Sequence, residues 1–456
     1  MSKAPRDKAS ADARVQRLKI GLANAALVIV ALAITYFVSE YVFFRHVLPH
    51  VTKDLRAYVP DRAEVYLQNA KAGYSPHDYI TLIGDSYAQG AGDWLWSIGF
   101  SNDKPYHSAN VIHDLSGKDV ITLGRGGAGS PEAMALRVSR VLGEADCYIF
   151  PPLEQPRRFF IYFYEGNDIY DNSRAVRRAL KRGGPDLRAN LDWVLEYDYG
   201  AQGRCYAQLS EMMGSMASFL AVDTMMKVRQ YVTHLLVKPA AAQRQAVAGA
   251  PSAAAVPSAA GTPDAPSAST AAHDKSPPAP NSVLVAGAAV RAPELQIPPA
   301  NLSERQLDEG VLVFDRSLAW FRRHFPNTPT TVVYIPSPAA VYRHAGASVT
   351  AKDFGHHFRP DPGADGAAPQ GPSFPVTEVY ASSQRLCEKI RAASLQQGAS
   401  FIDLRPTFRQ AGARQAIHGP TDWNHPNEAG YRLLGAIVAK HLADHPTDTC
   451  DDSWRS

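Results

Sequence analysis

The chain has 456 residues, of which 45% are hydrophobic and 20% charged, and its formal net charge is +3 at pH 7. A chain of this length builds one large domain or two ordinary ones with an ample core, which excludes a small scaffold held by disulfides. No dense run of Lys and Arg alternates with aromatic residues in the sequence. We therefore expect no nucleic-acid partner.

An apolar segment lies close to the N-terminus. Residues 20–38 carry no charged side chain, and about 20 apolar residues span the hydrocarbon core of a bilayer. Six Lys and Arg precede this segment, against two Asp. The positive-inside rule then predicts a cytoplasmic tail at 1–19, a transmembrane anchor at 20–44 and everything after about residue 45 outside the cytoplasm. A cleaved signal sequence and a buried helix of a cytosolic protein are the alternatives, and the length of the run and its lack of a polar face favour the anchor.

Composition divides the rest of the chain. Residues 239–300 are rich in Ala, Pro, Ser and Gly and contain no aromatic residue. Such a stretch cannot bury enough apolar surface to offset its ordering entropy, so we predict a disordered insertion. A membrane-proximal segment at 45–75 and one domain in two parts, 76–238 and 301–456, remain.

Short apolar runs alternate with helical patterns along this domain. Continuous β-branched or aromatic runs, typical of strands covered on both faces, occur at residues 79–83, 119–123, 159–164, 330–335 and 399–403. Apolar residues at three- and four-residue steps predict helices at 131–142, 311–325 and 426–442. This alternation predicts an α/β fold, a three-layer doubly wound parallel sheet.

Two further segments leave alternatives open. Residues 146–150 are either another strand or the approach to a pair of prolines. Residues 212–237 read as an amphipathic helix rather than a second membrane span, and a role at a membrane surface is the alternative.

A serine directly follows the first predicted strand, in the sequence Gly84-Asp85-Ser86. This tripeptide also forms ordinary turns. Reactive groups of open α/β sheets gather at the carboxyl ends of the strands, and Ser86 stands at such an end, before a helix expected at 93–98. The start of a helix directs backbone N–H groups at negative charge. Ser86 is therefore the candidate nucleophile, and it requires a base.

His425 is the candidate base. Proline follows it, which disfavours helix at His425 and favours a helix start at Pro426, so His425 ends a loop. Asp422 lies three residues earlier on the same loop, where its carboxylate would fix the imidazole tautomer and stabilise the imidazolium. The alternatives are a helix-capping role for Asp422 and a surface position for His425.

Acyl transfer also requires donors for the oxyanion of its tetrahedral intermediate. Gly127, after the second strand, offers a backbone N–H that no side chain obstructs, Asn167 offers its side-chain amide, and Ser86 offers its own N–H. A capping role for Asn167 and a simple tight turn at 124–129 are the alternatives. A phosphate-binding loop is excluded at 124–129 because no Lys-Ser/Thr follows.

With these residues, the chain resembles the SGNH, or GDSL-like, hydrolase superfamily. Members carry a nucleophilic Ser in a Gly-Asp-Ser block, an oxyanion Gly, an oxyanion Asn and a C-terminal Asp-x-x-His pair. The resemblance implies catalytic Ser86, Asp422 and His425, and an oxyanion hole of Ser86, Gly127 and Asn167. An α/β-hydrolase is the near competitor, but the chain contains no G-x-S-x-G elbow.

The chain departs from the family pattern at three places. Tyr87 stands where Leu usually follows the serine, and Thr122 stands where Asn often precedes the second block. The third block reads Glu-Gly-Asn-Asp, with Gly166 directly before Asn167. We interpret the first two departures as peripheral, and the third as one that leaves the amide in place.

The cysteines and histidines outside these blocks indicate no metal site. The four cysteines lack C-x-x-C spacing and are Cys147, Cys205, Cys387 and Cys450. In an oxidising compartment they form disulfides, with Cys387–Cys450 as one conceivable pair, or they stay unpaired. The doublet His356-His357 reads as a polar loop. We expect no cofactor.

Together these features predict a single-pass inner-membrane protein whose serine ester hydrolase domain acts in the periplasm or outside. Its partner would be an ester-bearing small molecule or an envelope glycan. A polysaccharide O-acetyltransferase using the same residues is the first alternative, although similar alginate-acetylating domains place the Asp-His pair ahead of the serine. A catalytically silent scaffold is the second.

Overall fold

The computed structural model describes residues 4–39, 42, 65–66, 68–73, 75–92, 104–143, 153–200, 281–292, 295–351, 373–443 and 449–451. Several features predicted above lie outside these residues: the helices at 93–98 and 212–237, the segment 146–150, residues 239–280 of the insertion, Cys147, Cys205 and His356-His357.

The N-terminal segment forms one long helix, α1 (Ala4–Val38). Its stretch Gln16–Val38 is long and apolar enough to cross a membrane, and none of that stretch is buried within the protein. Leu27 and Ile29, for example, are both exposed. Length and composition of this kind are typical of membrane anchors and of signal sequences.

The described part of the domain is built on a five-stranded parallel sheet. Its strands are β1 (Ile80–Ile83), β2 (Val120–Thr122), β3 (Arg158–Tyr164), β6 (Thr330–Ile335) and β10 (Ser400–Asp403). Their order, β10-β6-β3-β1-β2, is the flavodoxin-like doubly wound order, which reverses direction between β1 and β3. All five predicted strands are confirmed, as is the α/β fold class.

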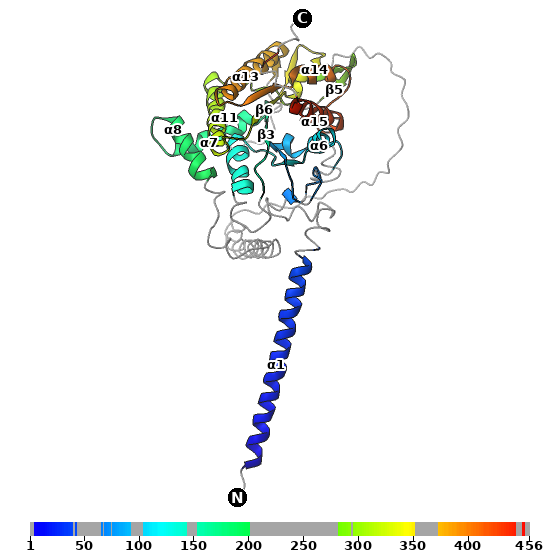
Figure 1. Cartoon of the computed structure of the whole chain (residues 1–456). Helices are drawn as coiled ribbons and strands as arrows, with labels where there is room; N and C mark the ends of the chain where they lie inside the picture. Colours follow the sequence, from blue (N-terminus) through cyan, green and yellow to red (C-terminus); the bar gives the residue numbers. More distant parts are fainter. Residues whose placement is uncertain are drawn as a thin grey trace, which may run out of the picture.

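Helices cover both faces of this sheet (Figure 1). On one side lie α7 (Asp168–Lys181), α11 (Glu304–His324) and α13 (Val376–Gln396), and on the other lie α6 (Ser108–Ser116), α14 (Arg405–Gly412) and α15 (Glu428–Ala443). Successive strand residues point to opposite faces. In β3, Ile161 and Phe163 enter the core beneath α7 and α11, whereas Tyr162 and Tyr164 enter the core beneath α6 and α15. This is the predicted three-layer arrangement.

Helix boundaries differ from the predictions where polar caps set them. α11 begins at Glu304, before the predicted start at 311, because Ser303 and Gln306 form a capping box. α15 begins at Glu428, after the predicted start at 426, and the Asn427 side chain accepts a hydrogen bond from Gly430 N–H at 3.2 Å. The helix predicted at 131–142 is a pair of wide π-helical segments, η3 (Glu132–Arg137) and η4 (Ser139–Gly143).

The predicted end of the insertion, at residue 300, is wrong. β4 (Ser282–Val285) and β5 (Ala288–Arg291) form an antiparallel hairpin, and β4 also pairs with β7 (Arg343–His344). Positive φ angles at Ala286 and Gly287 close the hairpin, as a two-residue turn requires. Val283 and Leu295 are buried, so residues 281–292 and 295–300 belong to the folded domain.

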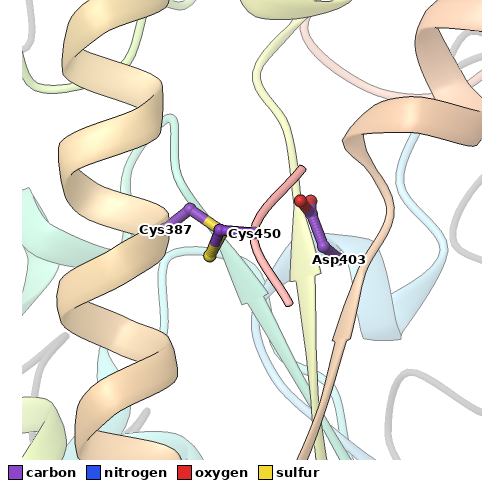
Figure 2. A group of neighbouring side chains, drawn as sticks. All are labelled: Cys387, Asp403 and Cys450. Atoms are coloured by element: carbon purple, nitrogen blue, oxygen red, sulfur yellow. A yellow bond between two sulfur atoms is a disulfide. The ribbon is translucent and has the colours of Figure 1, made fainter. Parts of the chain in front are cut away.

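A disulfide joins Cys387 on α13 to Cys450 near the C-terminus (Figure 2). Asp403 lies beside it, which gives this cluster the composition of a metal site. The two sulfur atoms are bonded to each other in the disulfide, however, so they offer no thiolate ligand. Both carboxylate oxygens of Asp403 accept hydrogen bonds from Arg405. The cluster is therefore a covalent tether beside a buried ion pair, and the conceivable Cys387–Cys450 pairing is confirmed.

Candidate active site

Ser86 stands where β1 ends against β3. A Cβ on Gly84 would come within 2.9 Å of the Tyr162 carbonyl oxygen, so only glycine fits this close approach. Asp85 then caps the one-turn helix α4 (Ser86–Gln89) by accepting the Tyr87 N–H at 2.9 Å. Ser86 is consequently the first residue of a helix, earlier than the helix expected at 93–98.

Ser86, His425 and Asp422 are brought together by the fold. His425 Nε2 lies 2.9 Å from Ser86 Oγ, and His425 Nδ1 lies 2.6 Å from Asp422 Oδ2. The fold closes this chain of hydrogen bonds although Ser86 and His425 are 339 positions apart. The contacts lie at the β1/β3 reversal of strand order, where open α/β sheets bind ligands.

The loop that carries Asp422 and His425 is held by its own polar groups and by buried tyrosines. Asp422 Oδ1 accepts the Asn424 N–H at 3.0 Å. The Asn424 carbonyl in turn accepts a hydrogen bond from the Tyr87 hydroxyl at 2.7 Å, and the Tyr164 hydroxyl oxygen lies 3.3 Å from it. Tyr87, which we expected to be peripheral, therefore anchors this loop.

The folded end of the insertion supports the same loop. Gln296 N–H donates to Asn424 Oδ1 at 2.8 Å, and the Gln296 side chain accepts a hydrogen bond from Tyr164. No sequence motif marks Gln296 or Tyr164, since their partners are distant in sequence.

Buried carboxyl groups surround the serine. Asp85 is fully buried and its Oδ2 lies 3.2 Å from Ser86 Oγ; burial raises the pKa of Asp85, although the Tyr87 N–H opposes that rise. Burial also raises the pKa of Asp168 well above its ordinary value, and the nearby Asp85 adds to that rise. Asp422 differs from both in being partly exposed and in facing the imidazole directly.

Gly127 lies in a turn beside Ser86. A Cβ on the adjacent Gly126 would lie 3.9 Å from Ser86 Cβ, whereas a Cβ on Gly127 would meet no described atom within 4 Å. Gly127 has a φ of +67°, which favours glycine. Open space therefore borders the backbone of Gly127, next to the candidate nucleophile.

Asn167 precedes the first residue of α7. The structure describes no capping hydrogen bond from its side chain, so the capping alternative is not supported. The side chain lies close enough to Asp85 to favour the carboxylate form of Asp85, and Asn167 Oδ1 is buried without a partner among the described atoms. Asn167 thus lies in the immediate surroundings of Ser86.

Thr122, the other departure from the family pattern, also acts near the site. Its hydroxyl donates to the Ala88 carbonyl at 2.5 Å and so ties the end of β2 to α4. Within the described ranges, the Cys387-Asp403-Cys450 group is the one cluster with metal-ligand composition, and both its sulfurs and its carboxylate are already engaged.

The solved structures similar to this chain include two enzymes from Streptomyces. An extracellular lipase from Streptomyces rimosus matches at 11% identity with a TM-score of 0.34, covering 79% of this chain and 98% of the lipase. A phospholipase A1 from Streptomyces albidoflavus matches at 11% identity with a TM-score of 0.32, covering 80% of this chain and 98% of the phospholipase. No family model matches the chain, and no curated protein matches it. Its function is therefore inferred from its own sheet order and site geometry.

Proposed function

We propose that this protein is a membrane-anchored serine ester hydrolase that acts outside the cytoplasm. The observation that carries the proposal is the continuous hydrogen-bonded chain from Ser86 Oγ through the His425 imidazole to Asp422 Oδ2. The chain lies at the carboxyl ends of the strands and combines a nucleophile, a base and a group that orients the base.

In the proposed reaction, Ser86 Oγ attacks the ester carbonyl carbon while His425 Nε2 takes the hydroxyl proton. The tetrahedral intermediate collapses when His425 returns that proton to the leaving alcohol, which leaves an acyl group on Ser86. Water, deprotonated by His425, then attacks the acyl carbonyl carbon. When this second tetrahedral intermediate collapses, His425 gives the proton to Ser86 Oγ and the acid is released. Asp422 accepts the hydrogen bond of His425 Nδ1–H throughout and stabilises the imidazolium.

The negative charge on the carbonyl oxygen requires donors. We assign this role to the N–H groups of Ser86 and Gly127 and to the amide of Asn167. The first residue of α4 supplies an N–H that no helical carbonyl occupies, and the open side of Gly127 leaves room for the substrate.

A location outside the cytoplasm is supported by two independent features. The apolar stretch Gln16–Val38 follows a basic N-terminal tail, which predicts a single pass with the C-terminal domain exported. The disulfide between Cys387 and Cys450 is of the kind that persists in oxidising compartments such as the periplasm. The substrate class we propose is an ester-bearing small molecule or an envelope glycan.

The test uses the full-length chain in mild detergent with p-nitrophenyl acetate as substrate. We expect hydrolysis by the native protein and its loss in Ser86→Ala, while Ser317→Ala, which changes a buried serine on α11, retains it. Adding sugar acceptors and measuring acylated product by mass spectrometry separates hydrolysis from acyl transfer. A protein without esterase activity, or an Ser86→Ala variant with native activity, would contradict the proposal.

A further inference from the structure

The loop that carries Gly127 is rich in glycine and depends on outside contacts for its shape. Residues 124–130, called here the 124–130 loop, contain glycine at four of seven positions. Glycine gives the backbone large conformational freedom. An oxyanion donor, by contrast, acts only when it is fixed before the reaction begins.

One set of contacts ties the 124–130 loop to the nucleophile. Gly126 N–H donates to the side chain of Gln89 on α4 at 2.8 Å, and Arg125 N–H donates to the Gly84 carbonyl at 3.2 Å. These bonds hold the first half of the loop against the turn that carries Ser86.

A second set ties the loop to α7. Ser130 N–H donates to Asn172 Oδ1 at 2.7 Å, and both groups are buried. The guanidinium of Arg174 donates through Nη2 to the carbonyl oxygen of Gly127 itself. A Cβ on Gly129 would lie 3.0 Å from Asn172 Oδ1, so the loop packs closely on the helix.

Arg174 is itself held in a fixed direction. Its Nη2 lies 2.7 Å from Asp171 Oδ1, and its Nε donates to the Asp171 carbonyl at 3.3 Å. Arg174 also lies seven residues, about two helical turns, after Asn167. The helix that presents Asn167 at its start therefore also presents the group that holds Gly127.

We propose that Arg174 is a positioning residue for the oxyanion site. By binding the Gly127 carbonyl it fixes the orientation of the peptides around Gly127, and it joins the 124–130 loop to α7, so that Gly127 and Asn167 are held as one unit. The inference rests on the proposed function, because that function gives Gly127 its role.

The kinetic test compares Arg174→Ala with Arg177→Ala in the full-length chain. Arg177 is an exposed arginine on the same helix that donates to Ser173 Oγ, so it controls for the loss of a positive charge on α7. In Arg174→Ala we expect kcat for p-nitrophenyl acetate to fall roughly 10- to 100-fold with KM changed less than about threefold, because only transition-state contacts weaken. Arg174→Lys should recover part of kcat at most, since the single nitrogen of lysine cannot replace both the Nε contact to the Asp171 carbonyl and the Nη2 contacts to Asp171 Oδ1 and the Gly127 carbonyl.

A second measurement does not depend on activity. Hydrogen–deuterium exchange of the same variants should show faster exchange for the amides of the 124–130 loop in Arg174→Ala than in Arg177→Ala, with the β3 and β6 amides unchanged. Unchanged loop exchange would overturn the proposal, and so would a loosened loop with native kcat. If the native protein is not an esterase, the proposed function fails by itself, and the exchange data still decide whether Arg174 holds the loop.

Discussion

Replacing Asp422 with asparagine should lower kcat more than the similar size of the two side chains implies. Asp422 Oδ1 accepts the Asn424 N–H, so the asparagine oxygen will occupy that position. Its NH2 group then faces His425 Nδ1, in place of Asp422 Oδ2. A donor there favours the tautomer that carries its proton on Nε2, and such an imidazole cannot accept the proton of Ser86.

The size of the expected loss in kcat follows from the negative charge that the substitution removes. An imidazolium and a carboxylate about 4 Å apart attract by about 4 kcal/mol at an effective dielectric of about 20 and by about 1 kcal/mol in bulk water. The side chains of His425 and Asp422 are 22% and 16% exposed, which places the pair nearer the first value. A loss of about 3 kcal/mol lowers kcat roughly 100-fold. The wrong tautomer adds to this loss in Asp422→Asn but not in Asp422→Ala.

The assay is steady-state hydrolysis of p-nitrophenyl acetate by the full-length native protein, Asp422→Asn and Asp422→Ala, with Asp308→Asn as a control. Asp308 is an exposed acid on α11 that pairs with Lys389 on α13. We expect both Asp422 variants to lose at least about 100-fold in kcat, with the asparagine variant slower. Equal activity of Asp422→Asn and the native protein would refute the assigned role of Asp422.

Three further predictions concern the supports of the site and of the fold. Tyr87→Phe removes the hydrogen bond to the Asn424 carbonyl. We expect kcat/KM to fall roughly 5- to 30-fold in steady-state kinetics and the unfolding free energy to fall by about 1 kcal/mol in urea unfolding. A native value of kcat/KM would contradict an anchoring role for Tyr87. Burial lowers the pKa of His418 to about 3. Between about pH 3 and 6.5, the unfolded chain therefore binds a proton at this residue that the folded chain does not, and the unfolding free energy rises with pH by about 1.4 kcal/mol per pH unit. His418→Gln should flatten that rise in urea unfolding from pH 4.5 to 6.5, and an unchanged slope would mean that another group is responsible. Cys387→Ser opens the link to Cys450 across 63 positions, which should lower the unfolding free energy by about 4 kcal/mol, and an unchanged Tm would show that the link contributes nothing.

The sheet could be predicted from sequence because its strands are buried on both faces. The run at 159–164 is continuously apolar or aromatic, and in the structure β3 buries Phe163 on one face and Tyr164 on the other. The ends of the helices were less predictable. The start of α11 depends on the reciprocal contacts of Ser303 and Gln306, which lie in a polar stretch with no apolar period.

The hairpin β4–β5 was missed for a different reason. Its short runs adjoin a long Ala/Pro/Ser-rich stretch, and composition averaged over residues 239–300 conceals them. Val283 is buried because β4 pairs with β7, some 60 positions further along the chain. A local pattern contains no information on that pairing.

The residues of the site also fall into those that the sequence predicted and those that it did not. Ser86, Asp422 and His425 were found because each stands in a short motif with a chemical reason for its spacing. Gln296 and Arg174 were not found, because each acts through one hydrogen bond to a loop that is distant in sequence. Only the folded chain shows which loop each residue holds.

The most direct test of the central claim is the site of covalent labelling by a fluorophosphonate. The full-length protein is treated in mild detergent, and the adduct is located by peptide mass spectrometry. We predict one phosphonyl group on Ser86, formed slowly in His425→Ala and absent in Ser86→Ala. Labelling of a different residue, or no labelling of the folded native protein, would contradict the assignment of Ser86 as an activated nucleophile.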